Sequence, residues 1–377
     1  MKAISHISRI LLGITFVFSG FVKGIDPWGA AYKFTDYFSA MGLDWLAWAA
    51  FPLGVLLAFA EFVIGAMLLF KLLIRFSSLL ALLFMAFFLP LTLWIALKNP
   101  VTDCGCFGDA LVISNWETFY KNIALFVFAI IVFVSRKKMK NIFNVNSNRF
   151  FGGVFILTYI FLVYYSYNHL PVLDFRPYKI GVNIPDAMTA PKDAKQDVYE
   201  SIFYYKNKNT DEIKQFSEDN YPWQDTLNWE FSDIKLSLVE KGYKPPIHDF
   251  IIEASDGEDV TDYFLSDESF VFILVAPNLH KSSLKSQAKI NELADWALSN
   301  EMSFICLTST LPSESQKFAN ANGVPYAFFQ CDETTLKTIV RPNPGLMVIR
   351  GGTIIGKWHY NDIPSPEEFQ NKFMNNN

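Results

Sequence analysis

The stretch from Phe76 to Leu97 reads FSSLLALLFMAFFLPLTLWIAL and contains no charged side chain. A helix needs about 20 mostly apolar residues to cross the roughly 30 Å of hydrocarbon in a bilayer. Four further stretches have the same character: Ile4–Val22, Trp45–Phe70, Thr118–Val134 and Phe150–Tyr165. The first resembles a signal peptide, but no small-residue cleavage site follows it, so we interpret it as a retained helix. The sequence therefore predicts five membrane-spanning helices.

Composition divides the chain into two parts of different character. Of its 377 residues, 51% are hydrophobic and only 18% are charged. Up to residue 171 there are 13 Lys and Arg against 7 Asp and Glu, whereas the remainder has 19 against 30. This pattern predicts a membrane part followed by an acidic soluble part. Nucleic acid is excluded as a partner because an acidic domain offers phosphates no counter-charge.

The distribution of basic residues predicts the orientation in the membrane. One set of loops carries most of them: Lys2, Lys71, Arg75, Arg136, Lys137, Lys138, Lys140 and Arg149. The opposite loops keep only Lys23, Lys33, Lys98 and Lys121. Because basic loops stay cytoplasmic, we expect a cytoplasmic N-terminus and, after five crossings, an outer C-terminal domain. We interpret this as a multi-pass protein of a bacterial inner membrane, embedded in lipid, with its C-terminal domain in the periplasm.

Two outward loops are distinctive. The first, Gly24–Asp44, is rich in aromatic residues and suits an amphipathic segment at the membrane interface. The second reads Asp103-Cys104-Gly105-Cys106-Phe107-Gly108-Asp109 and holds the only cysteines of the membrane part. Gly105 and Gly108 allow the tight turn that would bring the two thiols together. Asp103 and Asp109 oppose thiolate formation, so activation would have to come from a cation, with Lys98 and Lys121 nearest in sequence.

Three interpretations of Cys104 and Cys106 stay open. A disulfide closed across one glycine departs from the preferred geometry, and such disulfides exchange readily, which indicates a redox pair. The pair could instead be structural, either as a disulfide or as free thiols in a turn. A metal site fits worst, because structural zinc takes four Cys or His ligands and this loop has no histidine. No metal and no cofactor are therefore assigned, although a quinone is a candidate acceptor at the top of the bundle.

Glu61 lies in the middle of the second predicted helix. Placing a charge there costs about 2.5–3.5 kcal/mol on insertion scales, so the side chain should face the bundle interior and have a partner. Lys23, at the outer end of the first helix, is one candidate. Glu61 could take up protons beside a thiol or a quinone, or it could be a hydrogen-bonded residue of helix packing, and the sequence favours neither.

Two resemblances concern this N-terminal part. Ser19-Gly20-Phe21-Val22-Lys23-Gly24-Ile25-Asp26-Pro27, with Glu61, resembles the signature of DoxX-type membrane proteins. The segment Asp103-Cys104-Gly105-Cys106-Phe107-Gly108, followed by Lys121-Asn122, is similar to the MauE family, the membrane proteins of methylamine utilisation. The resemblance implies a four-helix transmembrane domain over residues 1–140, concerned with redox or disulfide maturation of exported proteins. We place a fifth, tethering helix at 148–168.

The C-terminal part alternates strands and helices. After a connector at 169–243, with a possible small helical or strand element at Asp197–Phe216, the elements succeed one another regularly. We expect strands at Phe250–Glu253, Phe270–Ala276, Ser303–Thr308 and Tyr326–Gln330, helices at Ser283–Ser299 and Ser313–Asn322, and a closing hairpin of Leu346–Arg350 with Thr353–His359. This order predicts a small α/β domain with a partly parallel sheet over residues 244–377.

This domain resembles thioredoxin-like proteins of the redoxin type. Pro245-Pro246-Ile247-His248-Asp249-Phe250 is similar to the segment that leads into that fold, and Arg341-Pro342-Asn343-Pro344-Gly345 resembles its cis-proline turn. The resemblance implies a cis bond before Pro344. The redox Cys-x-x-Cys of that family would follow Phe270–Ala276, but residues 277–283 contain no cysteine. The expected role is therefore docking or recognition. Cys306 and Cys331 are expected to be core residues, or a disulfide if their strands are adjacent.

The expected fold class is thus an all-α membrane bundle of four helices plus a fifth, followed by a soluble α/β thioredoxin-like domain. The leading function is thiol-disulfide exchange or electron transfer at the outer face, in which Cys104 and Cys106 exchange with a periplasmic client and Glu61 and Lys23 support them. The alternative is a non-catalytic, membrane-anchored assembly factor whose outer domain binds that client.

Overall fold

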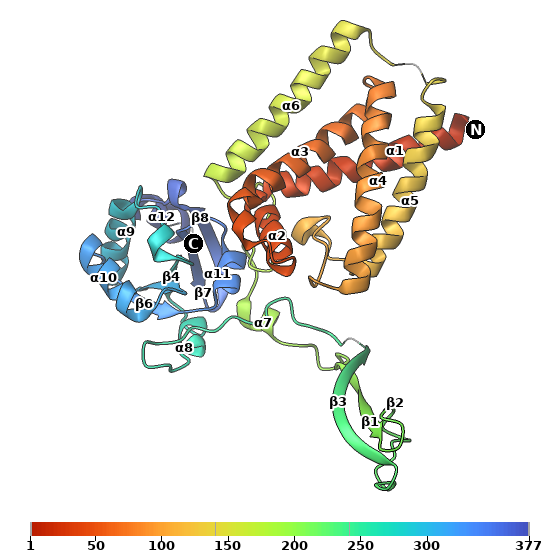
Figure 1. Cartoon of the computed structure of the whole chain (residues 1–377). Helices are drawn as coiled ribbons and strands as arrows, with labels where there is room; N and C mark the ends of the chain where they lie inside the picture. The colour runs from red at the N-terminus through yellow and green to blue at the C-terminus, as the bar shows by residue number, and fades with distance from the viewer. Residues whose placement is uncertain (1, 140, 241, 376–377) are drawn as a thin grey trace. The chain divides into compact units, whose positions relative to one another are not determined.

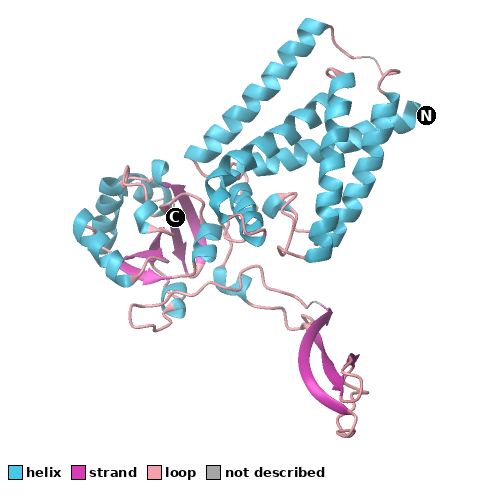
Figure 2. Ribbon diagram, in the orientation of Figure 1, coloured by secondary structure: helices cyan, strands magenta, loops and turns pink. Residues whose placement is uncertain are grey.

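The computed structural model describes residues 2–139, 141–240 and 242–375 (Figure 1). The chain forms two compact units. The first comprises Met1–Gly181 with Ile251–Asn377, and the second is Val182–Phe250. In Figure 2 the first unit is mainly helical as far as Asn168, whereas its C-terminal part combines strands and helices.

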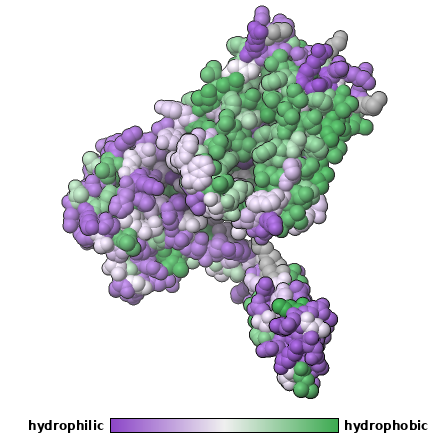
Figure 3. Space-filling model, viewed as in Figure 1, coloured by the Kyte–Doolittle hydropathy of each residue, from purple (hydrophilic) through white to green (hydrophobic). Residues whose placement is uncertain are grey.

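Five helices are long and apolar enough to cross a membrane, as predicted. They are α1 (Lys2–Ile25), α3 (Ala50–Leu69, extended at its start by the 3-10 turn η1, Asp44–Ala49), α4 (Ile74–Lys98), α5 (Asn115–Ser135) and α6 (Val145–Asn168). Figure 3 shows hydrophobic residues over the sides of these helices, with hydrophilic residues gathered near the N-terminal end. Such a surface is stable in lipid and would be unusual on a water-soluble monomer.

Close approach of α1 to α3 depends on glycine. A Cβ added at Gly20 would lie 2.5 Å from the backbone nitrogen of Phe62, and one added at Gly65 would lie 2.6 Å from that of Val17. Small residues at helix interfaces let backbones approach in this way. Leu12 and Phe16 of α1 then share a core with side chains from the other helices: Ile64, Leu68, Ile74, Ala81, Met85, Leu125, Ala129 and Val132.

The helix ends near the cysteine loop are defined by local sequence. Asp26 accepts a hydrogen bond from the backbone nitrogen of Gly29 and begins α2 (Pro27–Ala40), which occupies the loop expected to be amphipathic. Ser114 and Glu117 form a capping box at the start of α5. Between α4 and α5 lies the short turn η2 (Gly108–Ala110). The fifth helix, α6, packs through Tyr159, whose ring contacts Phe59 and Phe62 of α3.

The α/β part is built on a five-stranded sheet of order β6-β5-β4-β7-β8. Its strands are β4 (Phe270–Val275), β5 (Ser303–Thr308), β6 (Ala327–Gln330), β7 (Gly345–Arg350) and β8 (Thr353–His359). Strands β4, β5 and β6 are parallel, while β7 and β8 run antiparallel to them. Around the sheet lie α8 (Thr261–Leu265), η3 (Leu279–Lys281), α9 (Gln287–Ser299), α10 (Pro312–Asn322), α11 (Glu333–Ile339), η4 (Tyr360–Asp362) and α12 (Pro366–Phe373).

Most predicted elements of this part are present, but α8 was not predicted and three further elements differ. The strand expected at Phe250–Glu253 is wrong, because Glu253 forms only isolated bridges with Asp259 and Gln330. We missed α11, which Asp332 caps, and α12, which begins with a capping box of Ser365 and Glu368. The expected cis bond between Asn343 and Pro344 is confirmed.

The second unit contains a three-stranded antiparallel sheet of order β2-β1-β3, formed by β1 (Val198–Asn207), β2 (Ile213–Phe216) and β3 (Trp229–Glu240), together with α7 (Ile184–Met188). The sequence predicts only a partly structured connector in this region, so β3 is an element that the prediction lacks. The first two strands lie within the element that we placed at Asp197–Phe216.

Candidate functional site

Lys23 and Glu61 form a buried ion pair between α1 and α3. The Nζ atom of Lys23 lies 2.8 Å from Oε2 and 2.9 Å from Oε1 of Glu61, and the two side chains are only 10% and 9% exposed. The close packing at Gly20 brings the two helices near enough for this contact. Glu61 therefore faces the interior with Lys23 as its partner, an arrangement that compensates both charges.

Ser19 connects this ion pair to the cysteine loop. Its Oγ lies 2.8 Å from Oε2 of Glu61 and 2.7 Å from the carbonyl oxygen of Cys106, and it accepts a hydrogen bond from Lys23. One hydroxyl proton can serve only one of the two acceptors at a time. Ser19 is one turn before Lys23 on the same helix, so both side chains lie on one face. The backbone of the loop is thus attached to the charged pair inside the bundle.

The loop is also held from α2. Tyr37 donates a hydrogen bond to the carbonyl oxygen of Cys104 at 3.0 Å, and Lys33 forms an ion pair with Asp103 at 2.7 Å. Asp103 in turn accepts a hydrogen bond from the backbone nitrogen of Gly105. Gly105 has a φ of +66°, and a Cβ there would lie 2.9 Å from Lys33. Only glycine fits this turn without strain.

These contacts bring the two thiols together. The Sγ atoms of Cys104 and Cys106 are 3.2 Å apart, within hydrogen-bonding distance, and both residues are half-buried. The hydrogen bond from Cys104, with the charges of Lys121 and Lys23, lowers the pKa of Cys106 to about 6, against the effect of burial. The same hydrogen bond and burial raise the pKa of Cys104. One sulfur is therefore a thiolate at neutral pH and the other a thiol.

The acidic residues beside the cysteines are both paired. Asp103 is bound by Lys33, and Asp109 lies 2.9 Å from the guanidinium of Arg341. Because each carboxylate is paired with a cation, its negative charge opposes thiolate formation at Cys104 and Cys106 less strongly. Of the two cations that we considered from sequence, Lys121 acts on Cys106, whereas Lys98 is exposed at the end of α4.

A cavity of about 550 Å³ extends from the cysteine loop into the bundle. Its polar lining lies at the loop end and includes Lys23, Glu61, Cys104, Cys106 and Lys121. The rest is aliphatic and aromatic, contributed by α1 to α5: Phe16, Phe34, Phe38, Leu53, Leu56, Leu57, Phe84, Phe87, Phe88, Leu91, Ile95 and Leu125 among others. All four residues that we proposed as catalytic from the sequence therefore border one cavity.

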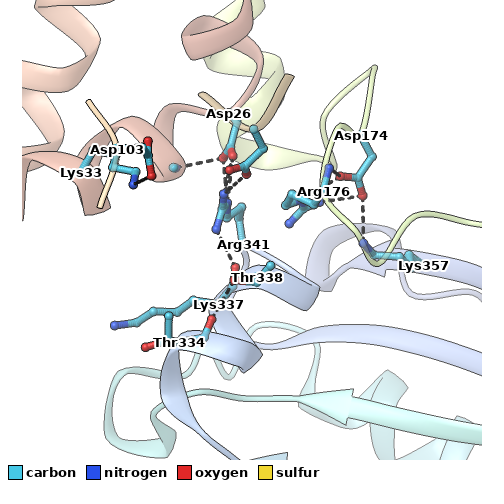
Figure 4. A network of polar contacts seen from close by, with 12 residues as sticks. Asp26, Lys33, Asp103, Asp174, Arg176, Thr334, Lys337, Thr338, Arg341 and Lys357 are labelled. Atoms are coloured by element: carbon cyan, nitrogen blue, oxygen red, sulfur yellow. Dashed lines mark hydrogen bonds and ion pairs between the residues drawn. The ribbon is translucent and has the colours of Figure 1, made fainter. Parts of the chain in front are cut away.

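A second, polar cavity of about 280 Å³ borders the loop at Gly105, Gly108 and Asp109. Gly105, Lys23 and Lys33 line both cavities. Figure 4 shows the polar network around it, in which Arg341 reaches Asp26 from the α/β part. Nearby, Asp174 contacts both Arg176 and Lys357, and these cations hold its pKa at about 2 despite burial. Both cysteines line the first, largely apolar cavity, and neither lines the polar one.

Four residues of the site were not proposed as functional from sequence: Ser19, Lys33, Tyr37 and Arg341. For Ser19 a signal existed, because it lies four residues before Lys23 in the quoted segment. Lys33 and Tyr37 come from α2, where no local pattern marks them, and Arg341 belongs to the quoted proline segment, which we related only to the cis-proline turn. Among the described residues, no group of three or more His, Cys, Asp and Glu side chains could hold a metal ion.

Cys306 is remote from this site. It lies on β5, is fully buried in the core of the α/β part beside Phe272 and Phe304, and forms no disulfide in the described part of the chain. Burial raises its pKa, so it is a poor nucleophile. Cys331, directly after β6, is also buried.

Comparison with known proteins gives two family matches. Residues 1–135 match the model of the methylamine utilisation protein MauE, so the N-terminal membrane part is MauE-like, as the sequence resemblance implied. Residues 199–241 match a domain of unknown function, DUF8463. No curated protein matches the chain.

One solved structure is similar in part. The solution structure of a proposed protein disulfide isomerase from Bacteroides thetaiotaomicron is 20% identical, and the match covers 33% of this chain and 80% of that one. Its TM-score of 0.26 is too low to establish a common fold.

Proposed function

We propose that Cys104 and Cys106 are the redox centre of a membrane thiol-disulfide oxidoreductase that acts at the outer face. The observation that carries this proposal is the 3.2 Å separation of the two sulfurs, one of which has a lowered pKa. A structural pair of thiols needs no such difference in pKa, whereas exchange does, because a sulfur with a low pKa leaves readily as a thiolate.

The exchange step follows from these pKa values. In the oxidised state a client thiolate attacks Cys104 and forms a mixed disulfide, while Cys106 leaves as a thiolate stabilised by Lys121 and Lys23. A second client thiolate then attacks the client sulfur of the mixed disulfide and expels Cys104, which takes up a proton. The client gains one disulfide, and the loop becomes a dithiol.

Lys23 and Glu61 support this centre in two ways. The charge of Lys23 favours the Cys106 thiolate. Through Ser19, the ion pair also holds the carbonyl oxygen of Cys106, and with it the loop. Lys23 and Ser19 come from the segment that resembles DoxX-type proteins.

We further propose that the α/β part is a thioredoxin-like domain that docks or recognises the client. Its sheet order and the antiparallel pair β7-β8 support this assignment. The loop after β4, residues 277–283, lacks cysteine, so the domain offers no redox thiol there. The similarity of residues 1–135 to the MauE model supports maturation of an exported protein as the process. We place the chain in a bacterial inner membrane with its C-terminus in the periplasm.

The test uses the full-length protein in lipid nanodiscs. Oxidised wild-type protein should convert a peptide carrying two thiols to its disulfide, and Cys104→Ser or Cys106→Ser should abolish this activity. Cys106→Ser should also trap a mixed disulfide between Cys104 and a disulfide-containing peptide, seen by intact-mass spectrometry. Val112→Ser, at an exposed position in the same loop, is the matched control and should act as wild type.

A second candidate function is a non-catalytic, anchored assembly factor. The ion pairs of Arg341 with Asp26 and Asp109 favour it, because they dock the α/β part on the helical part without any need for thiol chemistry. If the peptide is not oxidised and neither cysteine variant traps a partner, this scaffold function replaces the redox one.

A further inference from the structure

The large cavity beside the cysteines opens on the lipid-facing side of the helical part. Leu56 of α3 and Phe87 of α4 line it, yet they are 60% and 64% exposed. Both helices are long and apolar enough to span a membrane, and Figure 3 shows hydrophobic residues over the helical part. A ligand that enters between them therefore comes from the bilayer rather than from water.

The lining specifies a ligand with one polar end. At the loop end lie the two sulfurs and three lysines, Lys23, Lys33 and Lys121, whereas the remainder is almost entirely aliphatic and aromatic. A volume of about 550 Å³ falls within the range of about 300–1,000 Å³ that is usual for small-molecule sites. The ligand should carry hydrogen-bond acceptors at the loop end, where the lysines and the Cys104 thiol can donate, and an apolar tail toward Leu56 and Phe87.

Charge at the loop end favours a neutral polar group over a phosphate. Glu61 pairs with Lys23, and Asp103 pairs with Lys33, so two of the three lysines are already compensated. The third, Lys121, lies 4.2 Å from the ring centre of Phe107. A phospholipid headgroup would find little net positive charge here. A carbonyl oxygen, in contrast, needs only a hydrogen-bond donor.

The redox chemistry then identifies the class of ligand. Two thiols that become a disulfide release two electrons and two protons, and the acceptor must dissolve in the membrane to reach this cavity. We propose that the cavity binds an isoprenoid quinone, with its ring at the Cys104-Gly105-Cys106 turn and its tail directed to the opening between α3 and α4. This inference rests on the proposed function, because it supplies the oxidant that the exchange reaction needs.

The overall step is balanced. The Cys104 thiol loses its proton, Cys106 reacts as the thiolate that it is near neutral pH, one S–S bond forms, and the quinone takes two electrons, the proton of Cys104 and one proton from water to become a quinol. The two protons finish on the two quinone oxygens. The quinol leaves to the bilayer through the side opening, and the disulfide remains to oxidise a client.

The test begins with fully reduced, full-length protein in nanodiscs without oxygen. Addition of a short-tailed ubiquinone should form one quinol for each Cys104–Cys106 disulfide, measured by quinone absorbance and by alkylation mass spectrometry. The same ring without a tail should have a KM about tenfold or more higher, because the tail buries apolar surface in the cavity. Both measurements use wild-type protein, so they do not depend on the folding of a variant.

A variant pair locates the ligand. Leu56→Trp narrows the opening and should raise the KM for the quinone about tenfold. Leu83→Trp, on α4, is the matched control, since Leu83 is also exposed but does not line the cavity. The KM of this variant for the quinone should be unchanged.

A parallel arm with oxidised glutathione separates the two proposals. If glutathione oxidises the cysteine pair but the quinone does not, the quinone site is wrong while the exchange function stands. The same conclusion follows if Leu56→Trp and Leu83→Trp have the same KM for the quinone. If neither oxidant acts on the pair, the proposed function itself fails. If the protein retained a phospholipid in this cavity and excluded the quinone, the proposed quinone site would also be wrong.

Discussion

The guanidinium of Arg341 donates three hydrogen bonds of 2.7 to 3.0 Å to the carboxylate of Asp26, across 315 residues of sequence. Asp26 follows Lys23 by three residues, and Asp109, which Arg341 also contacts, follows Cys106 by three. This one side chain therefore joins the α/β part to both segments that hold the proposed redox centre. Paired, charge-assisted hydrogen bonds of this kind fix orientation as well as distance.

Arg341→Ala should loosen the α/β part from the cysteine loop. Removing one partner of a largely buried ion pair costs on the order of 3 kcal/mol, because Asp26 is left without compensation. Hydrogen exchange should then rise in residues 24–30 and 105–110. Arg350→Ala is the control, since Arg350 is an exposed arginine at the end of β7 in the same α/β part. Equal exchange in the two variants would contradict this role of Arg341.

Cys106 should be the reactive thiol near neutral pH. Because its pKa is lowered to about 6, its alkylation rate should be nearly maximal at pH 7 and fall as the pH drops through 6, while Cys104 reacts only at much higher pH. Cys104→Ala removes the hydrogen bond that is the main cause of the lowered pKa of Cys106. It should therefore shift the pH midpoint of Cys106 alkylation upward by more than Lys121→Met does. The measurement is peptide mapping after timed alkylation. A midpoint of Cys106 near its ordinary value would show that the pair is not activated.

The ion pair of Lys23 and Glu61 should be strongly coupled. Lys23→Met or Glu61→Gln alone should destabilise the protein by about 3–5 kcal/mol, since each leaves a buried group without its partner. The double variant should lose much less stability than the sum of the losses in the two single variants. Thermal unfolding in detergent measures the difference, with exposed Lys98→Met as control. Simple additivity would mean that the two side chains do not interact in the membrane.

Gly20→Ala should separate α1 from α3. The added methyl group would meet the backbone of Phe62, so the helices must move apart at a cost of about 1–3 kcal/mol, and the contact between Lys23 and Glu61 should weaken. The matched control is Gly152→Ala on α6, where a Cβ meets no atom within 4 Å. In Gly20→Ala, both the thermal unfolding and the pH midpoint of Cys106 alkylation should change. In Gly152→Ala, neither should change.

The orientation predicted from the basic loops is also testable. A C-terminal alkaline phosphatase fusion should be active, and a C-terminal fusion to a fluorescent protein that matures only in the cytoplasm should be dark. The Arg341 ion pairs place the α/β part at the end of the helices that carries the cysteine loop, so a membrane-impermeant maleimide should label Cys106 from outside. A fluorescent C-terminus would reverse the topology.

Features set by short stretches of chain could be predicted from the sequence. The five helices follow from runs of apolar residues, and most strands and helices of the α/β part follow from their periodicity, because burial in lipid or in a core is decided residue by residue. The tight turn at Gly105 and the cis bond before Pro344 are also local. The capped helices α11 and α12 were missed although Asp332 and Ser365 carry local capping signals, since short polar helices have little hydrophobic pattern.

The sequence by itself thus determined the membrane part, the alternating α/β part and the cysteine pair as a candidate centre. Only the tertiary structure decided which charges meet: Lys23 with Glu61, Lys33 with Asp103, and Arg341 with Asp26 and Asp109. It also decided that Cys106 rather than Cys104 has the lowered pKa, and that a cavity lies beside them. The physical reason is that electrostatic interactions and cavities depend on distances between residues far apart in the chain, which helix packing sets and no local pattern encodes.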